Sequence, residues 1–234
     1  MSNLTEHIKN LLQANGAELV GVGDLSEIDP KLRHEMPIGI SIAVRYPDEV
    51  IRQIADLPTA EYAAWYDVLN ESLERLVTLG AQELHSCGYA AVAMTREQVK
   101  SDNEGNKIPL STILPHKTVA TRAGLGWIGK CALLVTPSCG SMIRISTILT
   151  DAPLYADLPI DTSECGNCTS CAQACPGGAV LGTNWYAKRA RHEFLDAVKC
   201  RDTARKRSML GFGKDATICG KCIAVCPYTR GAWK

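Results

Sequence analysis

The residues of this chain whose types and spacing point to chemistry are its cysteines, because eight of the eleven belong to two motifs. The longer motif, C-x2-C-x2-C-x3-C-P, consists of Cys165, Cys168, Cys171 and Cys175, followed by Pro176. The shorter one, C-x2-C-x3-C-P, consists of Cys219, Cys222 and Cys226, followed by Pro227, with Cys200 alone upstream. Thiolates at these spacings are ligands of iron–sulfur clusters, and four of them hold one cubane. The eight cysteines therefore predict two [4Fe–4S] clusters.

The order of the cysteines also predicts which of them share a cluster. In such motifs the last cysteine of a run usually ligates the other cluster. One cluster would then be held by Cys165, Cys168, Cys171 and Cys226. The other would be held by Cys175, Cys200, Cys219 and Cys222. This crossed assignment uses all eight cysteines of the motifs.

Two other uses of paired cysteines stay open but match the pattern less well. Structural zinc sites also use C-x2-C pairs, but they require neither a third cysteine at the same interval nor a C-x3-C-P ending in both motifs. A disulfide framework is typical of secreted and usually much shorter chains. The remaining cysteines, Cys87, Cys131 and Cys139, are predicted to be small buried apolar residues.

The composition is that of a globular protein without charge bias. Of the 234 residues, 46% are hydrophobic and 21% are charged, and 25 basic residues balance 25 acidic ones. This balance gives no general case for binding nucleic acid or a membrane surface. The first residues lack the regions of a signal peptide, and no apolar run approaches the roughly 18 residues that span a bilayer. We therefore expect a cytoplasmic protein with no membrane partner.

The elements that must position the cysteines divide the chain by composition. Residues 1–150 have the mixed periodicities of an α/β domain, Pro and acidic residues mark a linker over 151–162, and residues 163–234 carry the cluster motifs. The last part is too short for a large core, so bound clusters would supply folding energy that hydrophobic burial cannot. The predicted elements are helices over 4–12 and 59–86, strands over 17–22, 38–44 and 89–94, and a hairpin of 131–136 with 142–149.

A glycine-rich segment precedes the cluster motifs. Residues 123–130 read Ala-Gly-Leu-Gly-Trp-Ile-Gly-Lys, and their spacing is not the G-x-G-x-x-G of a nicotinamide site. Glycines here permit positive φ and a close approach of backbone to a ligand. The segment is followed by Leu-Leu-Val at 133–135, Gly-Ser at 140–141, Ile-Leu-Thr-Asp at 148–151 and the cysteine motifs. In this order, these features closely resemble the epoxyqueuosine reductases. The resemblance is strong over about residues 115–230 and weaker over 1–114.

Epoxyqueuosine reductases are cobalamin-dependent relatives of the reductive dehalogenases, and the resemblance implies an α+β fold class. It implies a nitroreductase-like mixed α/β domain at 1–150 that binds a corrinoid, followed by a ferredoxin-like module with two clusters. The residues implied to contact the corrinoid are Gly124, Gly126, Trp127, Gly129 and Lys130. Cys200 falls where that family has a lone cluster ligand. A low-potential ferredoxin or flavodoxin would supply electrons, which would pass through the clusters to the corrinoid.

The chain departs from the family in two places that bear on its substrate. An ungapped match puts Leu110 where the family has an aspartate that acts as general acid, and an insertion or deletion would instead bring Asp102 or Glu104 there. The catalytic residue is therefore unknown. The sequence also stops at residue 234, where epoxyqueuosine reductases continue into a helical-repeat region that helps to grip tRNA. We therefore expect a short member of the family that lacks this region, and we do not expect tRNA as a partner.

Residues 188–207 are locally basic and permit two interpretations. In the first, the segment is a face that docks tRNA or an acidic electron donor. In the second, which we favour, its basic residues are solvated helix residues that offset the charge of the clusters. The leading hypothesis for function is an iron–sulfur oxidoreductase that passes low-potential electrons through two [4Fe–4S] clusters to a corrinoid and reduces an unknown substrate, for example a small molecule. The alternative is a ferredoxin-type electron-transfer protein without an organic cofactor that docks a redox partner.

Overall fold

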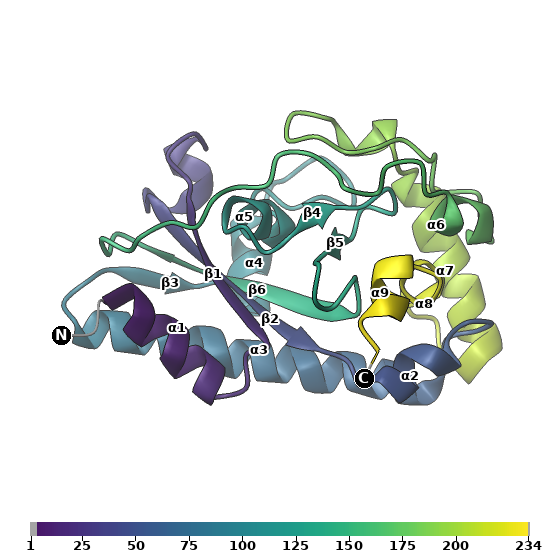
Figure 1. The fold of residues 1–234 in the computed structure, drawn as a ribbon, viewed down its shortest axis with the longest axis horizontal. Helices are drawn as coiled ribbons and strands as arrows, with labels where there is room; N and C mark the ends of the chain where they lie inside the picture. The colour runs from purple at the N-terminus through teal and green to yellow at the C-terminus, as the bar shows by residue number, and fades with distance from the viewer. Residues whose placement is uncertain (1–3, 234) are drawn as a thin grey trace. The chain divides into compact units, whose positions relative to one another are not determined.

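The computed structural model describes residues 4–233 and shows a mixed α/β fold, as predicted (Figure 1). It consists of two compact units, each assembled from three separate stretches of the chain. Unit 1 comprises Met1–Val44, Leu69–Leu125 and Arg144–Ile160, and unit 2 comprises Arg45–Val68, Gly126–Ile143 and Asp161–Lys234. The contiguous domain boundaries expected from composition stay a prediction.

Unit 1 is built on a four-stranded sheet with the strand order β1-β2-β6-β3. The strands are β1 (Leu19–Asp24), β2 (Ile38–Arg45), β6 (Ile143–Thr150) and β3 (Ala91–Ala93). β1 pairs with β2 in antiparallel register, and β3 pairs with β6 in the same sense. The strand predicted over 38–44 is β2, which has a neighbouring strand on each side and both of its faces buried.

Helices cover both faces of this sheet. The helices α1 (Leu4–Ala14) and α3 (Ala60–Ser86) lie along one face, and α5 (His116–Arg122) lies on the other (Figure 1). Glycines let the helices approach closely: a side chain on Gly80 of α3 would meet Ile148 of β6, and one on Gly39 of β2 would meet Val119 of α5. The core beside α5 contains Leu25, Met94, Leu114, Val119 and Leu149.

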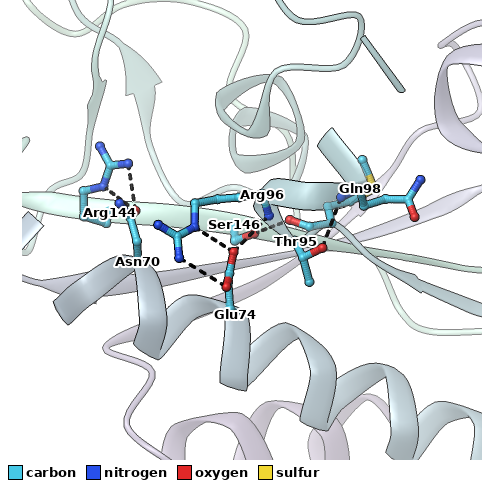
Figure 2. A network of polar contacts seen from close by, with 8 residues as sticks. Asn70, Glu74, Thr95, Arg96, Gln98, Arg144 and Ser146 are labelled. Atoms are coloured by element: carbon cyan, nitrogen blue, oxygen red, sulfur yellow. Dashed lines mark hydrogen bonds and ion pairs between the residues drawn. The ribbon is translucent and has the colours of Figure 1, made fainter. Parts of the chain in front are cut away.

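A polar network fixes α3 against β6 and against the start of α4 (Arg96–Asp102) (Figure 2). Asn70 accepts hydrogen bonds from Nε and Nη2 of Arg144 at 3.2 and 2.9 Å. Glu74 accepts from the backbone N–H of Arg96 at 3.1 Å and from its Nε at 2.8 Å. Thr95 caps α4 by accepting from the backbone N–H of Gln98 at 3.2 Å, as a helix N-cap does.

Unit 2 contains short helices and a small sheet. The strands β4 (Trp127–Ile128) and β5 (Leu134–Val135) pair in antiparallel register. The helices are α2 (Asp48–Gln53), α6 (Ser170–Ala174), α7 (Ala197–Phe212), α8 (Lys221–Ala224) and α9 (Pro227–Gly231). Asp196 caps α7 by accepting from the backbone N–H of Lys199, and Gly213 ends it in the left-handed conformation.

The predicted elements agree with the structure except at the hairpin. The long helix over 59–86 is confirmed as α3, and the other predicted helix and strands correspond to α1, β1, β2 and β3. The predicted hairpin of 131–136 with 142–149 is wrong, because β5 pairs with β4 whereas β6 lies between β2 and β3. The turn itself is present, since Thr136 and Gly140 form an isolated antiparallel bridge.

The segment predicted as a linker is hydrogen-bonded along unit 1 through residue 160. Asp157 accepts a hydrogen bond from the backbone N–H of Val22 at 2.8 Å and forms an ion pair with Lys9 at 2.8 Å. The backbone N–H of Ile160 donates to the carbonyl of Thr121 at 2.9 Å. These contacts fix an extended segment that has neither helix nor strand. Within residues 4–233, no helix has the length and apolarity needed to cross a membrane.

Candidate functional site

The first predicted ligand set surrounds a cavity in unit 2. Cys165 and Cys168 lie in the turn before α6, Cys171 lies on α6, and Cys226 is the N-cap of α9. All four line a cavity of about 330 Å³. The remaining lining residues are Gly129, Lys130, Cys131, Val135, Glu164, Cys222, Pro227 and Tyr228. Cysteines that are sixty residues apart in sequence therefore meet at one place, as the crossed assignment requires for Cys226.

Two of the proposed ligands around this cavity, Cys226 and Cys171, have raised pKa values. Burial raises the pKa of Cys226, and the nearby Cys165 adds to the effect. A hydrogen bond with Cys131 and then burial raise the pKa of Cys171 well above its usual range. These thiols are therefore protonated at neutral pH when no cluster is bound. Cluster assembly must release their protons, because only thiolates act as ligands.

The second predicted set is brought together in part. Cys200 of α7 lies close enough to Cys175 and Cys219 for their charges to act on it, and burial followed by these two neighbours raises its pKa. Cys175 accepts a hydrogen bond from the backbone N–H of Ala179 at 3.3 Å, an interaction that tunes the potential of a ligated cluster. Cys222 instead borders the first cavity. Its assignment to the second cluster stays a prediction.

The residues around the first cavity fit a [4Fe–4S] cluster in donor type and in space. Within residues 4–233, no three His, Cys, Asp or Glu side chains are arranged to hold a single metal ion. The thiols instead surround a space large enough for a larger group. A side chain at Gly129 would meet Val135 at 2.8 Å and would lie 3.7 Å from the sulfur of Cys165. The bare backbone at this glycine therefore leaves room beside a ligand sulfur.

Lys130 fixes the loop that carries two of these ligands. Its side chain is only 5% exposed, and its Nζ donates hydrogen bonds to the carbonyls of Gly166 and Cys168, both at 2.8 Å. Hydrogen bonds from a charged group contribute about 1.5–3 kcal/mol each. Lys130 thus holds the 165–168 loop in shape, and its contact with a corrinoid stays a prediction.

The other residues implied to contact a corrinoid also pack closely against the chain itself. A side chain at Gly124 would meet the carbonyl oxygen of Leu158 at 2.6 Å, and one at Gly126 would clash with the carbonyl of Val135. Trp127 is fully buried, and its ring contacts that of Tyr228 edge-on at 4.8 Å. The indole N–H of Trp127 has no hydrogen-bond partner among the described residues. The assignment of these residues to a corrinoid stays a prediction.

Leu110 and Asp102, at or near the place of the family's aspartate, lie in unit 1, as does His116. Leu110 is 40% exposed and has a positive φ of 57°. Asp102, at the end of α4, accepts hydrogen bonds from Gln98 at 2.7 Å and contacts His34 at 2.8 Å. His116, the first residue of α5, contacts Thr147 at 3.0 Å. Burial, and then the charge of Arg144, lower the pKa of His116 to about 4, so this imidazole is neutral at neutral pH.

The three cysteines outside the motifs differ in their surroundings. Cys131 and Cys139 are buried, as predicted, but Cys87 is exposed and that part of the prediction is wrong. Cys87 directly follows α3, where the helix ends and the apolar face no longer reaches the core. Cys131 lines the cavity of the first set, which the sequence did not indicate. Its place directly after the segment at 123–130 was the only available signal.

The basic segment 188–207 has many of its charges paired with nearby carboxylates. The ion pairs are Arg189 with Glu193, Lys199 with Asp196, Arg201 with Asp202 and Arg205 with Asp215. Such exposed pairs contribute little stability. They do reduce the net positive charge of the segment.

Comparison with known proteins agrees with the cysteine motifs. Residues 164–229 match the family of the 4Fe-4S double cluster binding domain. An epoxyqueuosine reductase of Listeria monocytogenes is 30% identical over 204 residues, which are 82% of this chain and 48% of that protein. The chain thus spans about half the length of this curated relative.

Solved structures show the same fold. An epoxyqueuosine reductase crystallised with a tRNA-Tyr epoxyqueuosine-modified stem loop superposes with a TM-score of 0.62 at 21% identity, over 99% of this chain and 66% of that one. A reductive dehalogenase, whose structure suggests a mechanism for B12-dependent dehalogenation, superposes with a TM-score of 0.72 at 20% identity, over 97% of this chain and 33% of that one. These findings give no support to the expectation that tRNA is not a partner. The chain is therefore a homologue of the epoxyqueuosine reductases, and its residues 164–229 match a 4Fe-4S double cluster binding domain.

Proposed function

We propose that this chain is an iron–sulfur reductase unit that takes up low-potential electrons and delivers them to a substrate. The observation that carries the proposal is the meeting of Cys165, Cys168, Cys171 and Cys226 around one cavity, beside a second group of thiols at Cys175, Cys200 and Cys219. When bound, two [4Fe–4S] clusters supply one-electron transfer at low potential. The protein's part is to hold the thiolates, exclude water and set the potentials.

One proposed ligand of the second set, Cys200, is more exposed than the other seven, which favours the approach of an electron donor from its side. Cys200 of the second set is exposed, whereas Cys165, Cys168, Cys171 and Cys226 surround a cavity and are partly buried. A protein donor of the ferredoxin or flavodoxin type would therefore approach the second set. Electrons would leave through the first set.

A corrinoid is the further part of the proposal. It is supported by the similarity to a reductive dehalogenase whose structure suggests a mechanism for B12-dependent dehalogenation. The order of the motifs in the sequence also supports it. When bound, a corrinoid would supply the reductive chemistry on the substrate. The residues proposed to contact it are those of the segment at 123–130, where Trp127 has an unpartnered indole N–H among the described residues.

Anaerobic reconstitution with iron, sulfide and cobalamin is the test of this proposal. After desalting, we expect about eight irons per chain, since each of two cubanes holds four, together with one corrinoid. Eight irons without a corrinoid would favour the ferredoxin-type electron-transfer protein. One zinc or no metal, with iron absent, would contradict the cluster assignment itself.

Reduction of epoxyqueuosine in tRNA is a second candidate function. It is favoured by the 30% identity to an epoxyqueuosine reductase and by the superposition on a structure that holds a modified tRNA stem loop. Lysine and arginine side chains of the basic segment 188–207 would contact the phosphates, although some of these charges are paired with carboxylates.

Salt dependence of binding distinguishes this candidate. If the chain binds a tRNA-Tyr stem loop through phosphates, affinity should fall steeply between 50 and 200 mM salt, by about tenfold or more for a few phosphate contacts. Double substitution of Arg191 and Lys206 by glutamine should flatten this slope. Weak binding that does not change with salt would contradict a tRNA substrate, while leaving the cluster proposal intact.

A further inference from the structure

A ninth cysteine lies among the proposed cluster ligands. Cys131 follows Lys130 in the loop between β4 and β5, and its side chain is buried. It lines the same cavity as Cys165, Cys168, Cys171 and Cys226, yet it belongs to neither cysteine motif. An additional thiol at this place needs an explanation, because the two clusters already have eight ligands.

The neighbours of this thiol connect the two ligand sets. Cys131 lines the cavity together with Cys171, proposed as a ligand of the first cluster. Cys222, which the crossed assignment gives to the second cluster, lines the same cavity. Cys131 therefore shares one cavity with a proposed ligand from each set.

A protonated thiol at this position has a definite effect on a cluster. An S–H group is a hydrogen-bond donor, although a weak one, and a coordinated thiolate is an acceptor. Reduction adds negative charge to a cluster and its sulfurs, so a donor to a ligand sulfur stabilises the reduced form more than the oxidised form. Hydrogen bonds to the sulfurs are one of the means by which proteins set cluster potentials.

We propose that Cys131 is a positioning and tuning residue whose S–H donates to the coordinated sulfur of Cys171 or of Cys222 and raises the potential of the cluster that this sulfur ligates. The inference rests on the proposed function, because it assumes that both clusters are bound. It assigns no ligand role to Cys131. The same geometry would let the residue act on either cluster.

The test compares three variants of the reconstituted chain. Cys131→Ala removes the donor, and Cys131→Ser keeps a hydroxyl donor in nearly the same place. Cys139→Ala is the matched control, because Cys139 is also a buried thiol of unit 2 but does not line the cavity. Iron content and midpoint potentials are measured by redox titration followed by electron paramagnetic resonance.

We expect Cys131→Ala to keep all its iron but to lower the potential of at least one cluster. A shift that changes the ratio of reduced to oxidised cluster about tenfold at a fixed potential equals 59 mV for one electron. Cys131→Ser should restore most of this shift, and Cys139→Ala should cause none. Unchanged potentials in a fully loaded Cys131→Ala chain would overturn the tuning role, and loss of iron from it would make Cys131 a ligand instead. A parent chain that binds no clusters would instead overturn the proposed function, and with it this inference.

Discussion

Replacing Cys226 by alanine is expected to remove the cluster held by Cys165, Cys168 and Cys171, although Cys222 is far closer to Cys226 in the sequence. The physical reason is that the structure places Cys226 on the cavity of the earlier motif, where Cys165 contributes to its raised pKa. A cubane that loses one of four thiolate ligands is poorly held. Iron content should fall by about half, and the remaining electron paramagnetic resonance signal should come from the second cluster.

Cys222→Ala is the control for this experiment. Under the crossed assignment it should remove the other cluster, so that the two variants keep complementary signals. A protein donor should still reduce the cluster that remains in Cys226→Ala, since the exposed Cys200 belongs to it. If both variants lose the same cluster, the crossed assignment is wrong. If the donor no longer reduces Cys226→Ala, electrons do not enter through the second set.

Replacing Gly140 by alanine is expected to destabilise unit 2 more than most single glycine substitutions. Gly140 has a φ of +55°, and a side chain here would lie closer than 3 Å to the backbone and hydroxyl of Thr229. Thr229 is fully buried and its Oγ1 accepts from the backbone N–H of Ser141 at 3.1 Å. Left-handed strain of about 1–2 kcal/mol would add to overpacking of about 1–3 kcal/mol. Because Thr229 follows Cys226 in α9, the first cluster should also be released faster.

Gly213→Ala separates strain from clash. Gly213 also has a positive φ, +72°, but nothing lies within 4 Å of the position of its added side chain. It should therefore show the strain alone. The free energy of unfolding from urea titration, and the rate of iron release to a chelator, are measured on both loaded variants. Equal losses at the two positions would contradict a steric role for Gly140.

The sequence predicted the features that depend on local spacing. Helix α3 extends for 27 residues, long enough for its three- and four-residue periodicity to be unambiguous, and its buried Leu73, Leu76 and Leu84 confirm the apolar face. The cysteine motifs likewise indicate iron–sulfur ligation from local sequence, because the type of the ligand residues and the intervals between them can both be read there. These signals identified the double-cluster domain that the family match confirms.

Features that depend on distant partners were not predictable in this way. The turn at 136–140 is real, but whether the following strand joins β5 or enters the larger sheet depends on β2 and β3, which lie far away in sequence. Lys130 is another case, since its hydrogen bonds to the carbonyls of Gly166 and Cys168 join residues that are far apart in the sequence. Cys87 was expected to be buried from its residue type alone, and the end of α3 overrides that tendency.

The meeting of Cys165 with Cys226 has a consequence for biosynthesis. A polypeptide emerges from the ribosome from its N-terminus, and domains generally fold in that order. Under the crossed assignment, the first cluster cannot be completed before Cys226 has been translated, and the second cannot be completed before Cys222. The loops that support the ligands, including Lys130, have by then already emerged. Cluster insertion therefore follows the synthesis of unit 1, whose stretches all precede residue 161.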